Sequence, residues 1–247
     1  MLSPAQDEQK NMKILFLDTE TTDLEDGRLI QLAYKNRLTG DTVNEYFKPP
    51  KEITVGAMSI HHVTNEMITD KPVFEGSQCK KELEILLESY ILVAHNALFD
   101  IGILQNEGVK TREFIDTLRV ARHVVESPEH KLQYLRYLLK LNVEGLAHDA
   151  WGDILVLEAL FEYLFPVVKE KFMLLTDEEV LNKMKELTAT PVPLKNFTFG
   201  KYNGKTFVEV SKMDRGYLDW LYNSESSKPL EEQNEDMIFT LKFYLGK

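Results

Sequence analysis

The chain has 247 residues and a formal net charge of −11, with 43% hydrophobic and 28% charged residues, ordinary values for a globular protein of one large or two domains. The acidic excess argues against tight binding of a nucleic-acid duplex, because basic surfaces dominate that affinity. The sequence has no apolar run long enough to cross a membrane, and its start (MLSPAQDEQKN) is too polar for a signal peptide. It has a single cysteine, Cys79, which excludes an internal disulfide. We therefore expect a cytoplasmic protein without a membrane partner.

The first predicted strand is followed by two acidic residues. Ile14 to Leu17 form an unbroken apolar run, which is typical of a strand buried on both faces. Side chains alternate along a strand, so Asp18 and Glu20 are expected to point the same way. Thr19 and Thr21 are small polar neighbours that leave the backbone accessible to a ligand. The segment indicates a site at the end of the strand, and an ordinary polar turn is the alternative.

The middle of the chain alternates strands with helices. The predicted strands are Arg28 to Asn36, Asp41 to Lys48, Tyr90 to Ala94 and Glu113 to Ile115, with a turn at 38–40 between the first two. After the last of them, Asp116 and Thr117 are expected to cap a helix that carries Arg119 and Arg122.

A third acidic residue follows the strand that ends at Ala94. His95 and Asn96 mark a turn, and Asn96 is the predicted N-cap of a helix from Ala97 to Asn106. Asp100 lies one turn into this helix, which is apolar around most of its circumference and is therefore expected to be buried. A buried carboxylate must be paired, hydrogen-bonded or bound to a cation. A local cap or an ion pair elsewhere in the chain is the alternative to a cation site.

The fourth acidic residue opens a late helix. A stripe at helical spacing faces the core, and it consists of Ile154, Leu157, Phe161, Leu164 and Phe165. Asp153 extends that stripe in the first turn. His148 precedes Asp153 by five residues, which on a continuous helix would turn it about 140° away. It can approach Asp153 only from a loop, and a surface loop histidine is the alternative interpretation.

The last part of the chain is separable. Residues 188–194 (TATPVPL) read as a linker, preceded by helical patterns over roughly 161–172 and 177–187. The run FTFGKYNGKTFVEV predicts a β-hairpin turning at Asn203-Gly204, and helices are expected over 213–222 and 234–245. The hairpin segment mixes lysines with aromatic residues, which suggests a nucleic-acid platform. The alternative is a small domain that uses these aromatics as its core.

The five candidate residues suit one chemistry. Four carboxylates brought together would repel one another and raise their pKa values. Two divalent cations roughly 4 Å apart would remove that repulsion and stabilise the attacking and leaving oxygens of phosphodiester hydrolysis. Oxygen ligands without cysteine favour Mg²⁺ or Mn²⁺. A histidine with an ordinary pKa near 6.5 suits a base that deprotonates water.

These segments resemble the motifs of the DEDDh family of 3′–5′ exonucleases. The order matches: D-x-E after the first strand, then HNA-x-FD, then H-x-x-x-x-D opening a late helix. AMSIHHVTNEMITDKPVF is similar to the family's I-H-G-I-T stretch with His62 in place of glycine, and KLQYLRYLL to its helix before the third motif. The C-terminal F-G-K-x-x-G-K-T followed by Y-L-x-W is similar to the module of exonuclease X-like proteins.

The resemblance implies an α/β fold, with a ribonuclease H-like mixed five-stranded sheet flanked by helices and a small α+β C-terminal module. It implies an exonuclease domain at 1–187 with its core at about 13–166, a linker at 188–195 and the module at 196–247, where nucleic acid or a protein partner would bind. It assigns two ions, Mg²⁺ or Mn²⁺, to Asp18, Glu20, Asp100 and Asp153, and the role of base to His148. Substrate contacts are assigned to Thr19, Thr21, Leu24, His95 and Asn96, with Leu24 against the 3′-terminal base.

The expected activity is hydrolysis at the free 3′ end of single-stranded DNA. A 3′–5′ exoribonuclease is the main alternative, because no motif here reports recognition of a 2′-hydroxyl. A non-catalytic nucleic-acid-binding protein of the same fold is a further alternative, although all five active-site residues are present. The sequence makes no prediction of the oligomeric state.

Overall fold

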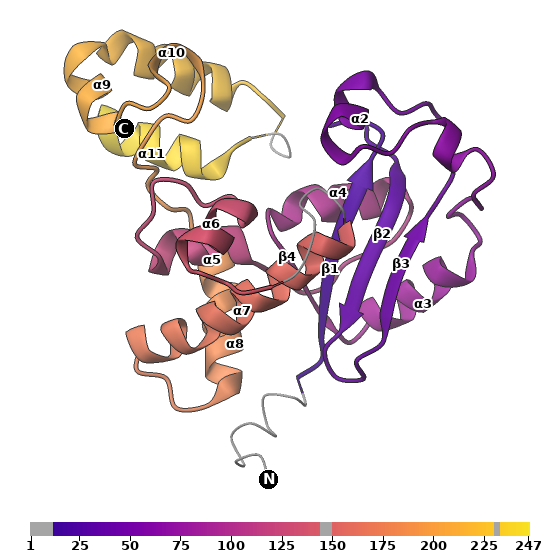
Figure 1. Cartoon of the computed structure of the whole chain (residues 1–247). Helices are drawn as coiled ribbons and strands as arrows, with labels where there is room; N and C mark the ends of the chain where they lie inside the picture. Colours follow the sequence, from indigo (N-terminus) through magenta and orange to yellow (C-terminus); the bar gives the residue numbers. More distant parts are fainter. Residues whose placement is uncertain (1–11, 144–149, 230–232) are drawn as a thin grey trace.

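The computed structural model describes residues 12–143, 150–229 and 233–247. Its centre is one five-stranded mixed sheet in the order β3-β2-β1-β4-β5 (Figure 1). The strands are β1 (Ile14–Thr21), β2 (Leu29–Asn36), β3 (Thr42–Tyr46), β4 (Ile91–Ala94) and β5 (Phe114–Asp116). β1 pairs antiparallel with β2, and β2 with β3, whereas β4 is parallel to both β1 and β5. This is the ribonuclease H-like arrangement that the sequence predicted.

Each face of the sheet is covered by helices because the strands are apolar on both sides. Ile14 and Phe16 pack in one core with the helices α5 (Thr117–Val124), α6 (Leu132–Leu138), α7 (Ala150–Lys171) and α8 (Asp177–Ala189). Leu15 and Leu17 pack in a second core with α3 (Gln78–Leu87) and α4 (Ala97–Asn106). The alternation of β1 therefore assigns its even-numbered side chains to the α7 face and its odd-numbered side chains to the α4 face.

The segment between β3 and α3 closes one end of the sheet. It contains α2 (Val55–His61) and the 3₁₀-helix η1 (Glu66–Ile68), and a small core of Ile30, Ile53, Val63 and Ile68 holds it. His62 ends α2 in the left-handed region, with φ of 60°. Glycine adopts that conformation most readily, which explains why the related stretch of the DEDDh family has glycine there.

The predicted C-terminal hairpin is wrong. The segment forms the 3₁₀-helix η2 (Gly200–Tyr202) and α9 (Phe207–Met213), and its β structure is a single bridge between Asn196 and Thr206. Thr206 caps α9 in a reciprocal capping box with Glu209, and this local signal outweighs the β propensity of the run. The remaining helices are α10 (Arg215–Ser226) and α11 (Glu235–Leu245).

The aromatic residues of that segment are mainly core. Phe197, Tyr202 and Phe207 are buried in the cluster that holds the module together, and Phe197 stacks on Phe207 with ring centroids 3.9 Å apart. Phe199 is different, because 44% of it is exposed. The interpretation of these aromatics as a small-domain core is therefore correct for three of the four.

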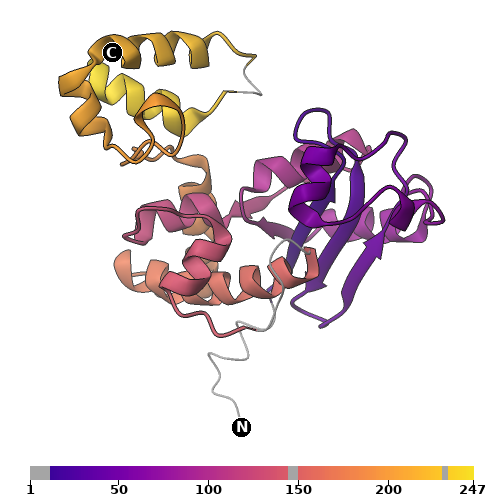
Figure 2. The ribbon, with the colours of Figure 1, turned by 45° about the horizontal axis from the view of Figure 1, so that its top comes forward.

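The C-terminal module lies beside α5 and α6 in both views of the ribbon (Figure 1 and Figure 2). The predicted linker starts too early, because α8 continues to Ala189 and Thr188 is buried. Among the described residues, no helix is long and apolar enough to span a membrane.

Candidate active site

Three of the predicted acidic residues lie together where β1 meets the start of α7. β1 continues to Thr21, beyond the apolar run, so Asp18 and Glu20 are strand residues on the α7 face. Asp153 lies in the first turn of α7, which packs on β1. One oxygen of each of the three carboxylates lies within 4.8 Å of the others, and all three residues are half-buried. A divalent cation with oxygen preference fits this donor set.

Asp100 is placed differently, on the α4 face of β1. It is 3% exposed, and its Oδ1 accepts hydrogen bonds from the Thr19 amide at 3.0 Å and from the Thr19 hydroxyl at 2.8 Å. It therefore lies outside the group of three, but its partner Thr19 is the β1 residue between Asp18 and Glu20. Burial raises the pKa of Asp100 to about 7, while the bonds from Thr19 act in the opposite direction.

The two threonines of β1 are both engaged. The Thr19 amide donates to Asp100, and the Thr21 hydroxyl donates to the Asp23 carbonyl at 2.8 Å. The Thr21 carbonyl lies 3.2 Å from Nε2 of the buried His61, whose Nδ1 accepts from the Val63 amide. Nε2 of His61 therefore carries the proton, and burial lowers the pKa of this ring. His61 thus ties the end of α2 to the end of β1.

Leu24 follows this strand end. It is 76% exposed, although it is a large apolar side chain. Gly27, three residues later, leaves no room for a Cβ, which would lie 2.5 Å from the Asp23 carbonyl oxygen. The turn that presents Leu24 is therefore tightly closed between Asp23 and Gly27.

His95 joins α4 to the loop before α6. Its Nε2 lies 2.8 Å from the His130 carbonyl and its Nδ1 lies 3.0 Å from the Thr117 hydroxyl. Because a carbonyl only accepts, Nε2 carries the proton, and burial lowers the His95 pKa to about 4. The ring is therefore neutral at pH 7 and has both nitrogens occupied.

Asn96 does not cap α4 through its side chain as predicted. It adopts the left-handed conformation with φ of 69°, which asparagine tolerates better than most residues, and its side chain makes no cap bond. Its amide donates instead to Asp116 Oδ1 at 2.9 Å, and Asp116 also accepts from the Leu118 amide at 2.9 Å as the predicted cap of α5. Asp116 therefore fixes the backbone that starts α4 and positions Asp100.

Two further polar residues were missed at the sequence level. Gln133 in the first turn of α6 donates from Nε2 to Asp153 Oδ1 at 2.5 Å, so it orients that carboxylate. Thr188 near the end of α8 accepts from the Asp116 amide at 2.9 Å. The only signal for Gln133 was its position in KLQYL, and Thr188 was assigned to a linker. His148 lies outside the described residues.

Comparisons with known proteins identify the family of both parts of the chain. The sequence model of the family described as "Exonuclease" matches residues 15–161, and the one described as "Exodeoxyribonuclease X-like C-terminal" matches residues 197–226. The chain is 31% identical over 235 residues to exodeoxyribonuclease 10 of Escherichia coli (strain K12), covering 93% of this chain and 97% of that protein.

Two further likenesses cover the larger domain. The chain is 29% identical over 171 residues to DNA polymerase III subunit epsilon of Buchnera aphidicola subsp. Acyrthosiphon pisum (strain APS), over 60% of this chain and 71% of that protein. A solved structure of exonuclease X in complex with 5′ overhanging duplex DNA is similar with a TM-score of 0.57 and 26% identity, over 71% of this chain and 99% of that chain.

Proposed function

The chain belongs to the exonuclease family, and from this premise we propose that it hydrolyses single-stranded DNA from the free 3′ end. The observation that carries the proposal is the gathering of Asp18, Glu20 and Asp153, from two elements far apart in sequence, within 4.8 Å. Likeness to exodeoxyribonuclease 10 over nearly the whole chain favours DNA as substrate.

Four carboxylates would hold two divalent cations, Mg²⁺ or Mn²⁺. Asp18, Glu20 and Asp153 form the group already described, and Asp100 adjoins it through Thr19. When bound, the cations neutralise the carboxylates and stabilise the attacking and leaving oxygens. Gln133 donates a hydrogen bond to Asp153 Oδ1, so this carboxylate is oriented before any ligand arrives.

His148 is assigned the proton transfer. Its place shortly before Asp153 in the sequence would bring a neutral imidazole to the attacking water, from which it takes a proton. Histidine is the side chain that most often accepts a proton in such a role near neutral pH.

The 3′ end is assigned to the exposed Leu24 beside β1, with its terminal base against that side chain. Thr19 and Thr21 would contribute backbone contacts at the same strand end. His95 and Asn96 border the cleft that contains Asp153, so the following nucleotide would pass them. Since both ring nitrogens of His95 are occupied, this residue would act through its shape and through the loop that it holds.

The test uses matched, 5′-labelled DNA and RNA oligonucleotides with Mg²⁺, with Mn²⁺ and with a chelator. We expect metal-dependent shortening from the 3′ end, with DNA degraded faster than RNA. A 3′-terminal phosphate should stop digestion, whereas a 5′-terminal block should not. Cleavage of a circular single strand would contradict the assignment and indicate an endonuclease. Faster degradation of RNA than of DNA would indicate that RNA is the substrate.

A further inference from the structure

A cleft of about 790 Å³ leads from the carboxylates to the C-terminal module. Its inner end is formed by His95, Asn96 and Asp153, and its outer end by Thr198 and Phe199. The volume lies within the range of roughly 300–1,000 Å³ that ligand sites occupy. Asp153 belongs both to the group of three carboxylates and to the lining of the cleft, so the candidate metal site opens into this cleft.

The two walls come from different parts of the chain. One wall is the end of α5, the loop after it and the start of α6, and it presents Lys131 and Tyr134, both exposed. The other wall is the segment between α8 and η2, and it presents Lys195 and Phe199, also exposed. Each wall therefore offers one exposed lysine and one exposed aromatic ring to the same space.

The cations of the cleft are available to an anionic ligand. Lys131 is 80% exposed in its side chain and lies 3.5 Å from Glu129, and Lys195 is 59% exposed and pairs with the exposed Glu126. Ion pairs this exposed contribute little to stability, so exchanging the carboxylate for a phosphate costs little.

The Phe199 ring of the cleft is held in place. Phe199 lies edge-on to the buried Phe197, with ring centroids 6.3 Å apart and planes at 69°. This contact anchors one side of the Phe199 ring and leaves 44% of the residue exposed. A ring fixed in this way is suited to stacking against a base, because little side-chain freedom is lost on binding.

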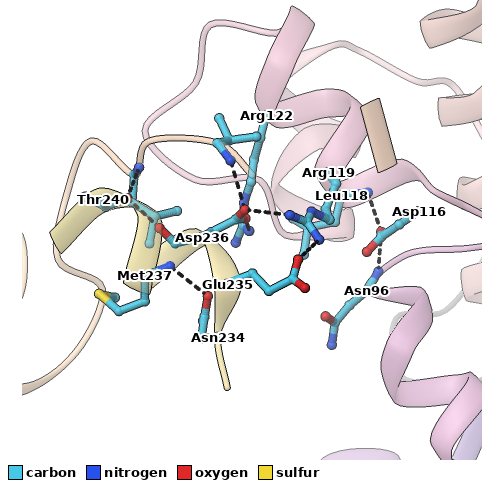
Figure 3. A network of polar contacts seen from close by, with 12 residues as sticks. Asn96, Asp116, Leu118, Arg119, Arg122, Asn234, Glu235, Asp236, Met237 and Thr240 are labelled. Carbon is cyan, nitrogen blue, oxygen red and sulfur yellow. Dashed lines mark hydrogen bonds and ion pairs between the residues drawn. The ribbon is translucent and has the colours of Figure 1, made fainter. Parts of the chain in front are cut away.

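A polar network fixes the module against the exonuclease domain and thereby sets the width of the cleft (Figure 3). Asp236 at the start of α11 is buried, with 3% of it exposed, and it forms ion pairs with Arg119 at 3.1 Å and with Arg122. It also accepts a hydrogen bond from the Val192 amide at 2.9 Å. Thr240 accepts from the Leu194 amide at 2.7 Å. The segment that carries Lys195 and Phe199 is therefore tied to α11, and α11 is tied to α5.

We propose that this cleft binds the nucleotides that precede the scissile 3′-terminal nucleotide. Their phosphates would lie between Lys131 and Lys195, and one base would stack on Phe199 opposite Tyr134. This inference rests on the proposed function for the direction of the strand. It makes the C-terminal module one wall of the substrate path. It also narrows the lysine–aromatic surface suggested by the sequence to Lys195 and Phe199, the two of its residues that carry the proposed contacts in the cleft.

The first test measures binding of a labelled single-stranded oligonucleotide to full-length protein in chelator, where no hydrolysis occurs. Phe199→Ala should weaken binding at least about fivefold, as expected for loss of one base–aromatic stack. Phe243→Ala, which removes a ring that is 69% exposed on α11 and does not line the cleft, is the matched control and should bind as the parent does. Equal affinities for the two variants would overturn the inference.

The second test uses salt. Removing one lysine that contacts phosphate should reduce the slope of log Kd against log salt concentration by about 0.7 for a single strand. Lys131→Ala should show this reduction, whereas Lys242→Ala on the exposed face of α11 should not. Coincident slopes for parent and Lys131→Ala would count against the cleft.

The third test locates the strand. An oligonucleotide with a photoreactive uracil next to the 3′ end should crosslink to Phe199 or Tyr134, and the same group at the 5′ end of a long strand should not. A crosslink only to residues outside the cleft would overturn the inference. If the parent digests from the 3′ end and Phe199→Ala binds as tightly as the parent, the proposed function stands and only the cleft is excluded. If the parent does not digest from the 3′ end but Phe199→Ala loses binding, the cleft stands as a nucleic-acid site and the proposed function is excluded.

Discussion

Replacing Asp100 with asparagine should stabilise the metal-free protein while abolishing its activity. Asp100 is 3% exposed, and the amide and the hydroxyl of Thr19 both donate to the same oxygen, Oδ1. Asparagine keeps an acceptor at that atom and removes only the ionisable group. The substitution therefore separates the cost of a buried charge from the loss of hydrogen bonds.

The size of the effect follows from the pKa. Burial raises the pKa of Asp100 from 3.8 to about 7, which corresponds to about 4 kcal/mol of unfavourable ionisation in the folded state. Below pH 3.8 the Asp100 carboxyl is protonated in both the folded and the unfolded chain, so its burial costs no ionisation free energy. As pH rises, the unfolded chain releases the proton first, so the parent loses about 1.4 kcal/mol of stability per pH unit until the folded pKa is passed.

The measurement is the free energy of unfolding of parent and Asp100→Asn in chelator, across pH values from about 4 to 8. We expect the variant's advantage to grow from near zero to about 4 kcal/mol, or roughly 8–16 °C in Tm. Asp70→Asn, which changes an exposed carboxylate, is the matched control. Added Mg²⁺ or Mn²⁺ should raise the Tm of the parent more than that of Asp100→Asn. A difference in unfolding free energy between variant and parent that stays constant with pH, or that shrinks as pH rises, would refute the reasoning.

Three further predictions concern the site and the docked module. Asp18→Ala should abolish hydrolysis in a folded protein whose metal-free stability is equal or higher, since one repelling carboxylate is gone; near-normal turnover would contradict the metal assignment. His148→Ala should lower the rate by about 10²–10⁴-fold with metal binding intact by calorimetry, and a collapse of metal affinity would make it a ligand. Asp236→Ala leaves Arg119 and Arg122 without their buried partner, so thermal unfolding should show a loss of about 3–5 kcal/mol and proteolysis should cut faster at 190–196. An unchanged Tm and cutting rate would show that this network does not hold the module.

Local periodicity was sufficient for most of the sheet and for the direction in which most candidate acidic residues point. An apolar run followed by D-x-E implies a buried strand with two acidic side chains on one face, because side chains alternate on any strand. An apolar helical stripe that begins with Asp153 implies a carboxylate pointing inward at the first turn. The bounds of α4 were also correct, because its apolar run begins directly after the turn at His95-Asn96 and gives way to polar residues at Gln105 and Asn106.

The same local reasoning failed where two local signals competed. The C-terminal run combines β-prone residues and an Asn-Gly turn with a T-x-x-E capping box. A hairpin and a capped helix are both compatible with such a sequence. Burial of Phe197, Tyr202 and Phe207 in one cluster decides for the helix, and that burial depends on α10 and α11.

The sequence by itself determined which residues are candidates for the chemistry and which way they face along their own elements. Only the tertiary structure decided that Asp153 meets Asp18 and Glu20, that Gln133 orients Asp153, and that Asp100 is held by Thr19. It also decided that a cleft joins this site to the C-terminal module. The physical reason is that strand and helix periods are properties of the local backbone, whereas distances between remote residues depend on how whole faces pack.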